Sequence, residues 1–250
     1  MKETLEANII LLDIEGTTTP IDFVYQKLFP YVRIHLMEFL KSCFYDPEVQ
    51  KEIQILKKES EADPFSSSSS QNSSLYLKEN GIQWIYDLIV NLMDQDKKYT
   101  GLKSIQGKIL KSGFERGILK GEVYPDVLPA FKRWTHQGKK IAIYSSGSIH
   151  TQQLLFENST AGNLTGYISC YFDTTTGSKK ERESYDKISK KLFVQPLQIV
   201  FLSDSLSELD AAKQAGLLTR WSVRSNEPLN QSKKLNTGHS VIFTFDEVYP

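Results

Sequence analysis

Polar residues of a few reactive types follow three apolar runs of this 250-residue chain, at 9–12, 141–144 and 199–202. Continuous apolar runs are typical of strands buried on both faces of a parallel sheet. In such sheets the ligand crevice lies outside the carboxyl ends of the strands. We therefore expect the polar residues that follow the runs to gather at one edge. They are Asp13 with Glu15, Ser145 with Ser146, and Asp204.

The three acidic residues of this set suggest a metal site. Asp13 and Glu15 are two positions apart, so at strand spacing their side chains point to the same side. Together with Asp204 they would concentrate negative charge, which is costly unless a cation lies between them. Because all the ligands are oxygens, Mg²⁺ is the natural choice.

A loop between the second and third of these runs contains Lys179 and Lys180. A cation, a lysine and serine hydroxyls flanked by backbone N–H groups together suit a phosphoryl group. A carboxylate nucleophile would then form an aspartyl-phosphate and divide hydrolysis into two steps. A second carboxylate would protonate the leaving group and later activate water. The pattern indicates a phosphatase.

Each feature also has an ordinary interpretation. An acid after a strand is often a turn residue or a helix cap, and Asp204 alone would be taken as an N-cap. Ser-Ser-Gly alone is more often a turn than a phosphate site, and two adjacent lysines usually form a solvated surface. The joint occurrence of the features, in this order and at strand ends, favours chemistry.

The rest of the pattern predicts the elements that position these residues. Strands and helices alternate from about residue 123 onward, which predicts right-handed βαβ units and a parallel sheet. Residues 21–122 show only helical periodicity. We therefore predict an α/β fold with a Rossmann-like parallel-sheet core at 1–20 and 123–250. Residues 21–122 are predicted to form an inserted all-helical cap with a disordered Ser-rich loop near 65–75.

Helix signals can be placed within the cap. Asp46-Pro47-Glu48 is a typical helix start, with a capping side chain, proline in the first turn and an acid behind it. The first cap helix is expected to bury apolar residues at helical spacing. They are Phe23, Leu28, Tyr31, Ile34 and Phe39.

Composition excludes several classes of protein. Lys plus Arg and Asp plus Glu number 30 each, so a formal charge of zero gives no support for a nucleic-acid or membrane surface. Cys43 and Cys170 form neither a disulfide framework nor a metal-ligand pair. The polar start has no signal-peptide pattern, and no apolar run is long enough to span a bilayer. We expect a soluble monomer in the cytoplasm, with the nucleus as a second compartment.

The order of the motifs resembles the haloacid dehalogenase superfamily, whose first motif usually has Asp where this chain has Glu15. Further segments resemble one branch of that superfamily, the enolase-phosphatases (acireductone synthases) of methionine salvage. These segments are 11–21, 28–31, 143–148, 153–156, 166–167 with 171–173, and 201–204.

The resemblance implies an activity. A Mg²⁺-dependent bifunctional enzyme, with one ion per subunit, would act on a small phosphorylated metabolite. It would enolise 2,3-diketo-5-methylthiopentyl-1-phosphate and remove the phosphate, giving 1,2-dihydroxy-3-keto-5-methylthiopentene (acireductone).

The resemblance also implies residue roles. Asp13 would be the nucleophile and a metal ligand, and Glu15 an acid/base that binds the metal through its backbone carbonyl. Asp204 would bind the metal. Glu208 would either support it through water or cap its helix. The residues implied to bind substrate are Ser145, Ser146 and Lys179, with Lys180 as the alternative to Lys179.

The chain departs from the branch at two places. The Trp expected three residues after Gln106-Gly107 is absent, and Arg224-Ser225-Asn226-Glu227 stands where the branch has Arg-Pro-Gly-Asn. Neither departure touches the phosphate chemistry. Two alternatives stay open. One is a phosphatase of the same fold for another small phosphorylated metabolite, since the cap is the least specific part of the match. The other is a non-enzymatic phosphate-binding or partner-binding module, which would need a broken catalytic position, and none of the candidate positions is broken.

Overall fold

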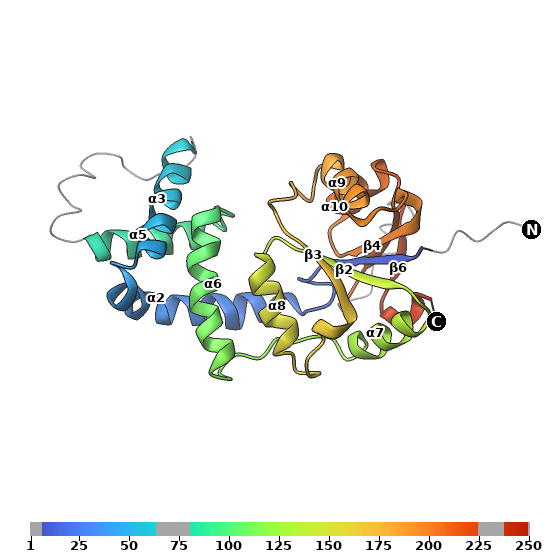
Figure 1. The fold of residues 1–250 in the computed structure, drawn as a ribbon, viewed down its shortest axis with the longest axis horizontal. Helices are drawn as coiled ribbons and strands as arrows, with labels where there is room; N and C mark the ends of the chain where they lie inside the picture. Colours follow the sequence, from blue (N-terminus) through green and yellow to red (C-terminus); the bar gives the residue numbers. More distant parts are fainter. Residues whose placement is uncertain (1–6, 64–80, 225–237, 250) are drawn as a thin grey trace, which may run out of the picture. The chain divides into compact units, whose positions relative to one another are not determined.

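The computed structural model of the protein describes residues 7–63, 81–224 and 238–249. The chain divides into two compact units, one formed by Met1–Val24 with Lys120–Pro250 and the other by Tyr25–Leu119. Figure 1 shows the elements of both units. The predicted Ser-rich loop near 65–75 lies outside the described residues.

A parallel six-stranded sheet forms the centre of the first unit. Its strand order is β3-β2-β1-β4-β5-β6, and every neighbouring pair is parallel. This confirms the predicted α/β fold class. The strands are β1 (Ile9–Leu12), β2 (Lys140–Tyr144), β3 (Ile168–Phe172), β4 (Ile199–Ser203), β5 (Leu218–Ser222) and β6 (Ser240–Ile242).

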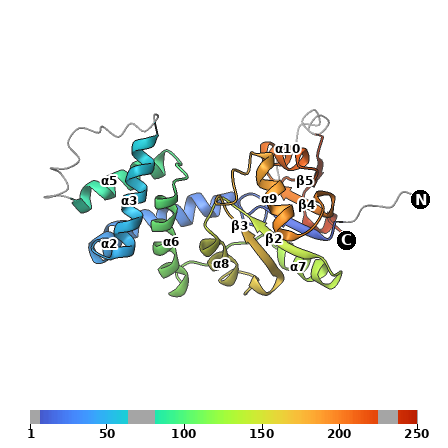
Figure 2. The ribbon, with the colours of Figure 1, turned by 45° about the horizontal axis from the view of Figure 1, so that its top comes forward.

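Helices cover both faces of this sheet. Figure 2, turned from the view of Figure 1, shows α9 and α10 over one face and α7 over the other. Rings of α7 and α8 pack together through Phe131 and Phe156. The helices are α7 (Val127–His136), α8 (Ile149–Glu157), α9 (Arg182–Leu192) and α10 (Leu206–Gln214), with short helices at Thr165–Tyr167, Pro196–Gln198 and Phe245–Glu247.

The register of the central strands aligns their carboxyl ends. Leu12 of β1 pairs with Ile143 of β2 and with Leu202 of β4. All residues of β1 and β4 are buried, as expected for strands covered on both faces. The residues that follow each strand therefore come out at one edge of the sheet.

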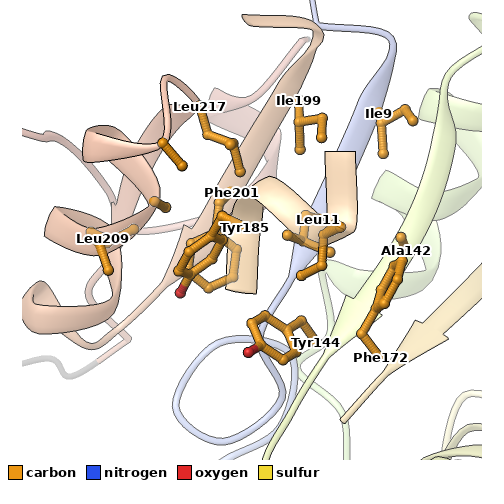
Figure 3. Close-up of a cluster of buried hydrophobic side chains, with 14 residues drawn as sticks. Ile9, Leu11, Ala142, Tyr144, Phe172, Tyr185, Ile199, Phe201, Leu209 and Leu217 are labelled. Atoms are coloured by element: carbon orange, nitrogen blue, oxygen red, sulfur yellow. The ribbon is translucent and has the colours of Figure 1, made fainter. Parts of the chain in front are cut away.

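A buried apolar cluster supports the sheet on the α9 and α10 side. Figure 3 shows Tyr185 of α9 among Leu11, Tyr144 and Phe201 from three strands. The rings of Tyr144 and Tyr185 meet edge to face, with centroids 5.7 Å apart. The hydroxyls of both tyrosines donate hydrogen bonds to backbone carbonyls of the loop between β3 and α9. The two tyrosines therefore connect this loop to the core.

The described elements of the second unit are all helical. Helix α3 packs on α6, and α2 packs on both α5 and α6. Asp46 accepts hydrogen bonds from the N–H groups of Glu48 and Val49, so the predicted helix start is confirmed. The helices are α2 (Phe29–Cys43), α3 (Pro47–Ala62), α5 (Gly81–Asp94) and α6 (Thr100–Glu115), preceded by α1 (Ile21–Phe23) and a π-helical segment (Val24–Leu28).

The predicted apolar face of α2 is partly wrong. Ile34 is 74% exposed, whereas Val32, Leu36 and Leu40 are fully buried. The predicted residues before Ile34 are all buried, so the predicted spacing holds across the π-helical segment and fails only within α2. The buried face follows the i, i+4 series from Val32 instead.

No helix among the residues described is long and apolar enough to cross a membrane. Cys43 and Cys170 are both free thiols.

Gly101 tests the packing of α3 on α6. A Cβ at this position would lie 2.6 Å from the Glu52 carbonyl oxygen and the Leu56 backbone nitrogen. We expect Gly101→Ala to lower the free energy of unfolding by about 1–3 kcal/mol, because the overlap outweighs the better helix propensity of alanine. Urea unfolding of the full chain measures this.

The matched control is Gly166→Ala, because nothing lies within 4 Å of a Cβ added there. A Gly101→Ala protein as stable as the wild type would contradict the described helix contact.

Candidate active site

Asp13 follows β1 directly and is 3% exposed. Its Oδ1 accepts hydrogen bonds from the Ile14 N–H at 2.7 Å and from the Lys179 ammonium at 2.6 Å. Its Oδ2 lies 3.3 Å from the Ser203 hydroxyl, a looser contact. One carboxylate oxygen is therefore firmly held and the other is more available.

Lys179 links Asp13 to a second acid. Its side chain is 8% exposed, and its Nζ lies 2.7 Å from Oε2 of Glu208. Burial alone would lower the pKa of Lys179, but the carboxylates of Asp13 and Glu208 raise it above its usual value. The lysine therefore stays charged. Lys180 is exposed, so of the two candidates the structure brings Lys179 to Asp13.

Two buried tyrosines fix the loop that presents Lys179. The Tyr185 hydroxyl donates to the Lys179 carbonyl at 2.7 Å, and the Tyr144 hydroxyl donates to the Gly177 carbonyl at 2.9 Å. Because both rings belong to the core of the sheet, the lysine backbone is anchored to a rigid element.

Ser203 is a member of this network that the sequence analysis did not single out. It is the last residue of β4 and fully buried. Its hydroxyl lies within hydrogen-bond distance of Asp13 Oδ2 and, at 3.0 Å, of Glu208 Oε2. A hydroxyl has one proton, so it donates to one of these carboxylates at a time. A polar residue ending an apolar run is the only signal that the sequence offered for it.

Asp204, one residue on, packs against Gly16. Gly16 has a φ of +71°, and a Cβ there would overlap the Asp204 carboxylate. Burial and the nearby charge of Asp13 raise the pKa of Asp204 to about 6, although Lys179 opposes the shift. The Trp221 indole N–H donates to the Asp204 carbonyl at 3.0 Å and holds the backbone.

Glu208 lies in the first turn of α10. Burial, followed by the charge of Asp13, raises the pKa of Glu208 to about 7, although Lys179 and Ser203 favour its ionised form. From the sequence, a water-mediated metal contact or helix capping was predicted for this residue. The structure adds a direct ion pair with Lys179, for which the sequence has no signal.

The remaining candidates lie at the same sheet edge but are not joined to Asp13 by the hydrogen bonds described above. Ser145 is 1% exposed, and its hydroxyl accepts from the Gly147 N–H at 3.2 Å. Ser146 and Glu15 are half-buried. Ser145 and Ser146 follow β2, and Glu15 follows β1. The hydrogen-bonded network instead joins Asp13 to Lys179, to Ser203 of β4 and to Glu208 of α10.

The charges of the network are unbalanced. Asp13, Asp204 and Glu208 are three carboxylates grouped around one buried ammonium, Lys179. Within the described ranges, no group of three or more His, Cys, Asp and Glu side chains is placed to hold a metal ion. Mg²⁺ needs fewer, because it is usually bound through one or two carboxylates and keeps several waters. Asp13 and Asp204 supply two neighbouring carboxylates, which is the number that such an ion uses.

Comparison with known proteins identifies the family. The family model described as haloacid dehalogenase-like hydrolase matches residues 7–216. The protein named enolase-phosphatase E1 in Synechococcus elongatus is 44% identical over 239 residues, which cover 96% of each chain. The protein of the same name in Drosophila willistoni is 42% identical over 230 residues, 92% of each chain. The chain belongs to the enolase-phosphatase E1 family.

Membership of this family confirms the resemblance found in the sequence and makes the chain a hydrolase of the phosphatase type. The crystal structure of the UTR4 protein of Saccharomyces cerevisiae matches with a TM-score of 0.75 and 30% identity, covering 97% of this chain and all of that one. A dehalogenase crystal structure matches at 16% identity with a TM-score of 0.53, which shows a shared fold alone.

The pKa of Glu208 predicts a pH dependence of stability. Its value rises from 4.5 to about 7 on folding, so between these limits the folded protein binds more protons than the unfolded chain. The free energy of unfolding should therefore fall as pH rises through this range. In chelator, Glu208→Gln should flatten this fall, as measured by urea unfolding at about pH 5 and about pH 8.

The slope with pH is the informative quantity, because losing the ion pair with Lys179 also changes absolute stability. The control is Glu183→Gln, an exposed acid in the first turn of α9. An unchanged slope in Glu208→Gln would contradict the assignment.

Proposed function

We propose that this protein is a bifunctional enolase-phosphatase of methionine salvage. Its substrate would be 2,3-diketo-5-methylthiopentyl-1-phosphate and its products acireductone and inorganic phosphate. The relatives named enolase-phosphatase E1 support the pair of activities. The observation that carries the phosphatase half is the buried Asp13 carboxylate, fixed through one oxygen by Lys179 at a strand end.

Asp13 is the nucleophile in this proposal. Lys179 and the Ile14 N–H hold Oδ1, so Oδ2, with its longer contact to Ser203, is the oxygen that attacks phosphorus. A P–O bond forms to Oδ2 while the bond between phosphorus and the substrate oxygen breaks. Water then attacks the same phosphorus, releasing inorganic phosphate and restoring the carboxylate.

Glu15 moves the protons of both steps. It protonates the departing oxygen of the enolised substrate, and it later removes a proton from the attacking water. Ser145 and Ser146, with the backbone N–H groups of their turn, bind the phosphate oxygens. Lys179 balances the charge that develops on the phosphoryl group, since the two flanking acids keep it protonated.

Asp13 and Asp204, together with the backbone carbonyl of Glu15, would hold one Mg²⁺ per subunit. When bound, the ion neutralises phosphate charge and polarises the diketone. The grouping of three carboxylates around one ammonium supports a cation at this place.

Asp13→Asn tests the nucleophile. Asparagine has nearly the same shape as aspartate, but its amide is a far weaker nucleophile than a carboxylate. Phosphate release should therefore fall on the order of 10³-fold or more. Enolisation, followed by absorbance, should remain detectable. Phosphate release at the wild-type rate would show that the nucleophile is misassigned. The control is Asp246→Asn, an acid of the same unit whose side chain is 65% exposed.

Glu15→Asp tests the enolisation base, for which Glu15 is our candidate. The superfamily usually has the shorter aspartate at this position, so the variant should keep phosphate release. It should slow removal of the carbon-1 proton, because the shorter arm reaches less far. If both half-reactions keep their wild-type rates, the enolisation base must be another residue.

The substrate itself is tested by measuring phosphate release from a panel of small phosphorylated metabolites with Mg²⁺ present. The diketone phosphate should give the highest kcat/KM. A far better substrate elsewhere in the panel would favour the alternative, a phosphatase of the same fold with a different metabolite.

A further inference from the structure

Arg224 is a buried cation outside the network described above. Its side chain is 7% exposed and pairs with Asp126 through Nη1 at 2.6 Å. The guanidinium carbon lies 4.6 Å from the ring centroid of Tyr124 and 4.2 Å from that of Phe245. Contacts of this kind fix the plane of the guanidinium group, so its remaining donors have defined directions.

One of those donors reaches the turn that follows the nucleophile. Nε of Arg224 donates to the Thr17 carbonyl at 2.9 Å. The neighbouring carbonyl, that of Thr18, accepts from the Tyr124 N–H at 3.0 Å. The Thr17 hydroxyl is buried and has no hydrogen-bond partner in the part of the chain that the structure describes. The turn is therefore held from outside through two carbonyl groups, those of Thr17 and Thr18.

The turn is also hydrogen-bonded within itself, to the carbonyl of its own first residue, Ile14. The N–H groups of Thr17, Thr18 and Thr19 all point at the Ile14 carbonyl, at 2.9–3.1 Å, and the Gly16 N–H donates to the Thr19 carbonyl at 2.8 Å. The turn is thus a compact unit held by its own hydrogen bonds. Arg224 fastens this unit to α7 through Asp126.

Two features of the proposed site belong to the same turn. Glu15 lies within it, and Gly16 packs against the Asp204 carboxylate so closely that a Cβ would overlap it. A shift of the turn would therefore change the position of the acid/base and the surface beside a proposed metal ligand at once.

We propose that Arg224 is a positioning residue for the reaction. By holding the Thr17 carbonyl it fixes the 14–19 turn. It thereby fixes the position of Glu15 and the contact between Gly16 and the Asp204 carboxylate. The inference rests on the proposed function only for the roles of Glu15 and Asp204. The mechanical part, that Arg224 orders the turn, stands on the contacts alone.

Arginine is required here rather than any cation. Its planar fork places Nε and Nη1 on two acceptors while its faces stack on two rings, and a lysine ammonium cannot do both. Arg224→Lys should therefore be an incomplete substitute for arginine, and Arg224→Gln should be the more damaging change.

The experiment compares kcat, KM and backbone hydrogen exchange in Arg224→Gln, Arg224→Lys and Arg220→Gln. Arg220 is the matched control, because it lies on β5 and donates to the Thr219 carbonyl within its own strand. Arg224→Gln should lower kcat on the order of 10²-fold, as expected for a small misplacement of reacting groups, and should change KM much less. Exchange of the Thr17–Thr19 amides should become faster without any substrate present.

Arg224→Lys should lie between the wild type and Arg224→Gln, and it serves as the test variant if Arg224→Gln does not fold. Wild-type kcat and exchange in the Arg224 variants would overturn the inference, and so would an equal loss in Arg220→Gln. If the wild type releases no phosphate from the diketone, the proposed function fails. The amide exchange alone then decides whether Arg224 orders the turn.

Discussion

The two ion pairs of Lys179, with Asp13 and Glu208, are the interaction on which the candidate site depends. Asp13 and Lys179 are buried and Glu208 is partly buried, and a charge alone in that environment would be costly. Together they join the end of β1, the loop before α9 and the first turn of α10. The Tyr144 and Tyr185 hydroxyls anchor the lysine loop to the sheet, so the position of the nucleophile follows from the packing of the core.

The same interaction leaves a deficit of positive charge. One ammonium cannot neutralise Asp13, Glu208 and the neighbouring Asp204. Burial, and after it the charge of Asp13, raises the pKa values of Asp204 and Glu208. A phosphorylated substrate would add further negative charge at the same edge. We therefore expect substrate and a divalent cation to bind together, because the cation relieves the repulsion among protein carboxylates and also the charge of the phosphate.

Much of this arrangement was predictable from the sequence because it depends on periodicity. Continuous apolar runs predict β1 and β4, and parallel strands bring Asp13 and Asp204 to one edge. Contacts that depend on loop conformation have no such signal. The resemblance favoured Lys179 over Lys180, but its hydrogen bond to Asp13 depends on the loop conformation. The Glu208–Lys179 pair requires the tertiary placement of α10. Ile34 was misplaced because the apolar residues of α2 fit two overlapping helical series, and the buried series runs i, i+4 from Val32.

The central claim is that Asp13 carries the phosphoryl group during turnover. The most direct measurement is to quench the enzyme with acid while it hydrolyses the diketone phosphate in Mg²⁺, and then to locate covalent phosphate by peptide mass spectrometry. The account predicts a phosphoryl group on Asp13, in a peptide that is unmodified in a sample quenched before substrate is added. Covalent phosphate on another residue, such as Glu15 or Ser145, would contradict it.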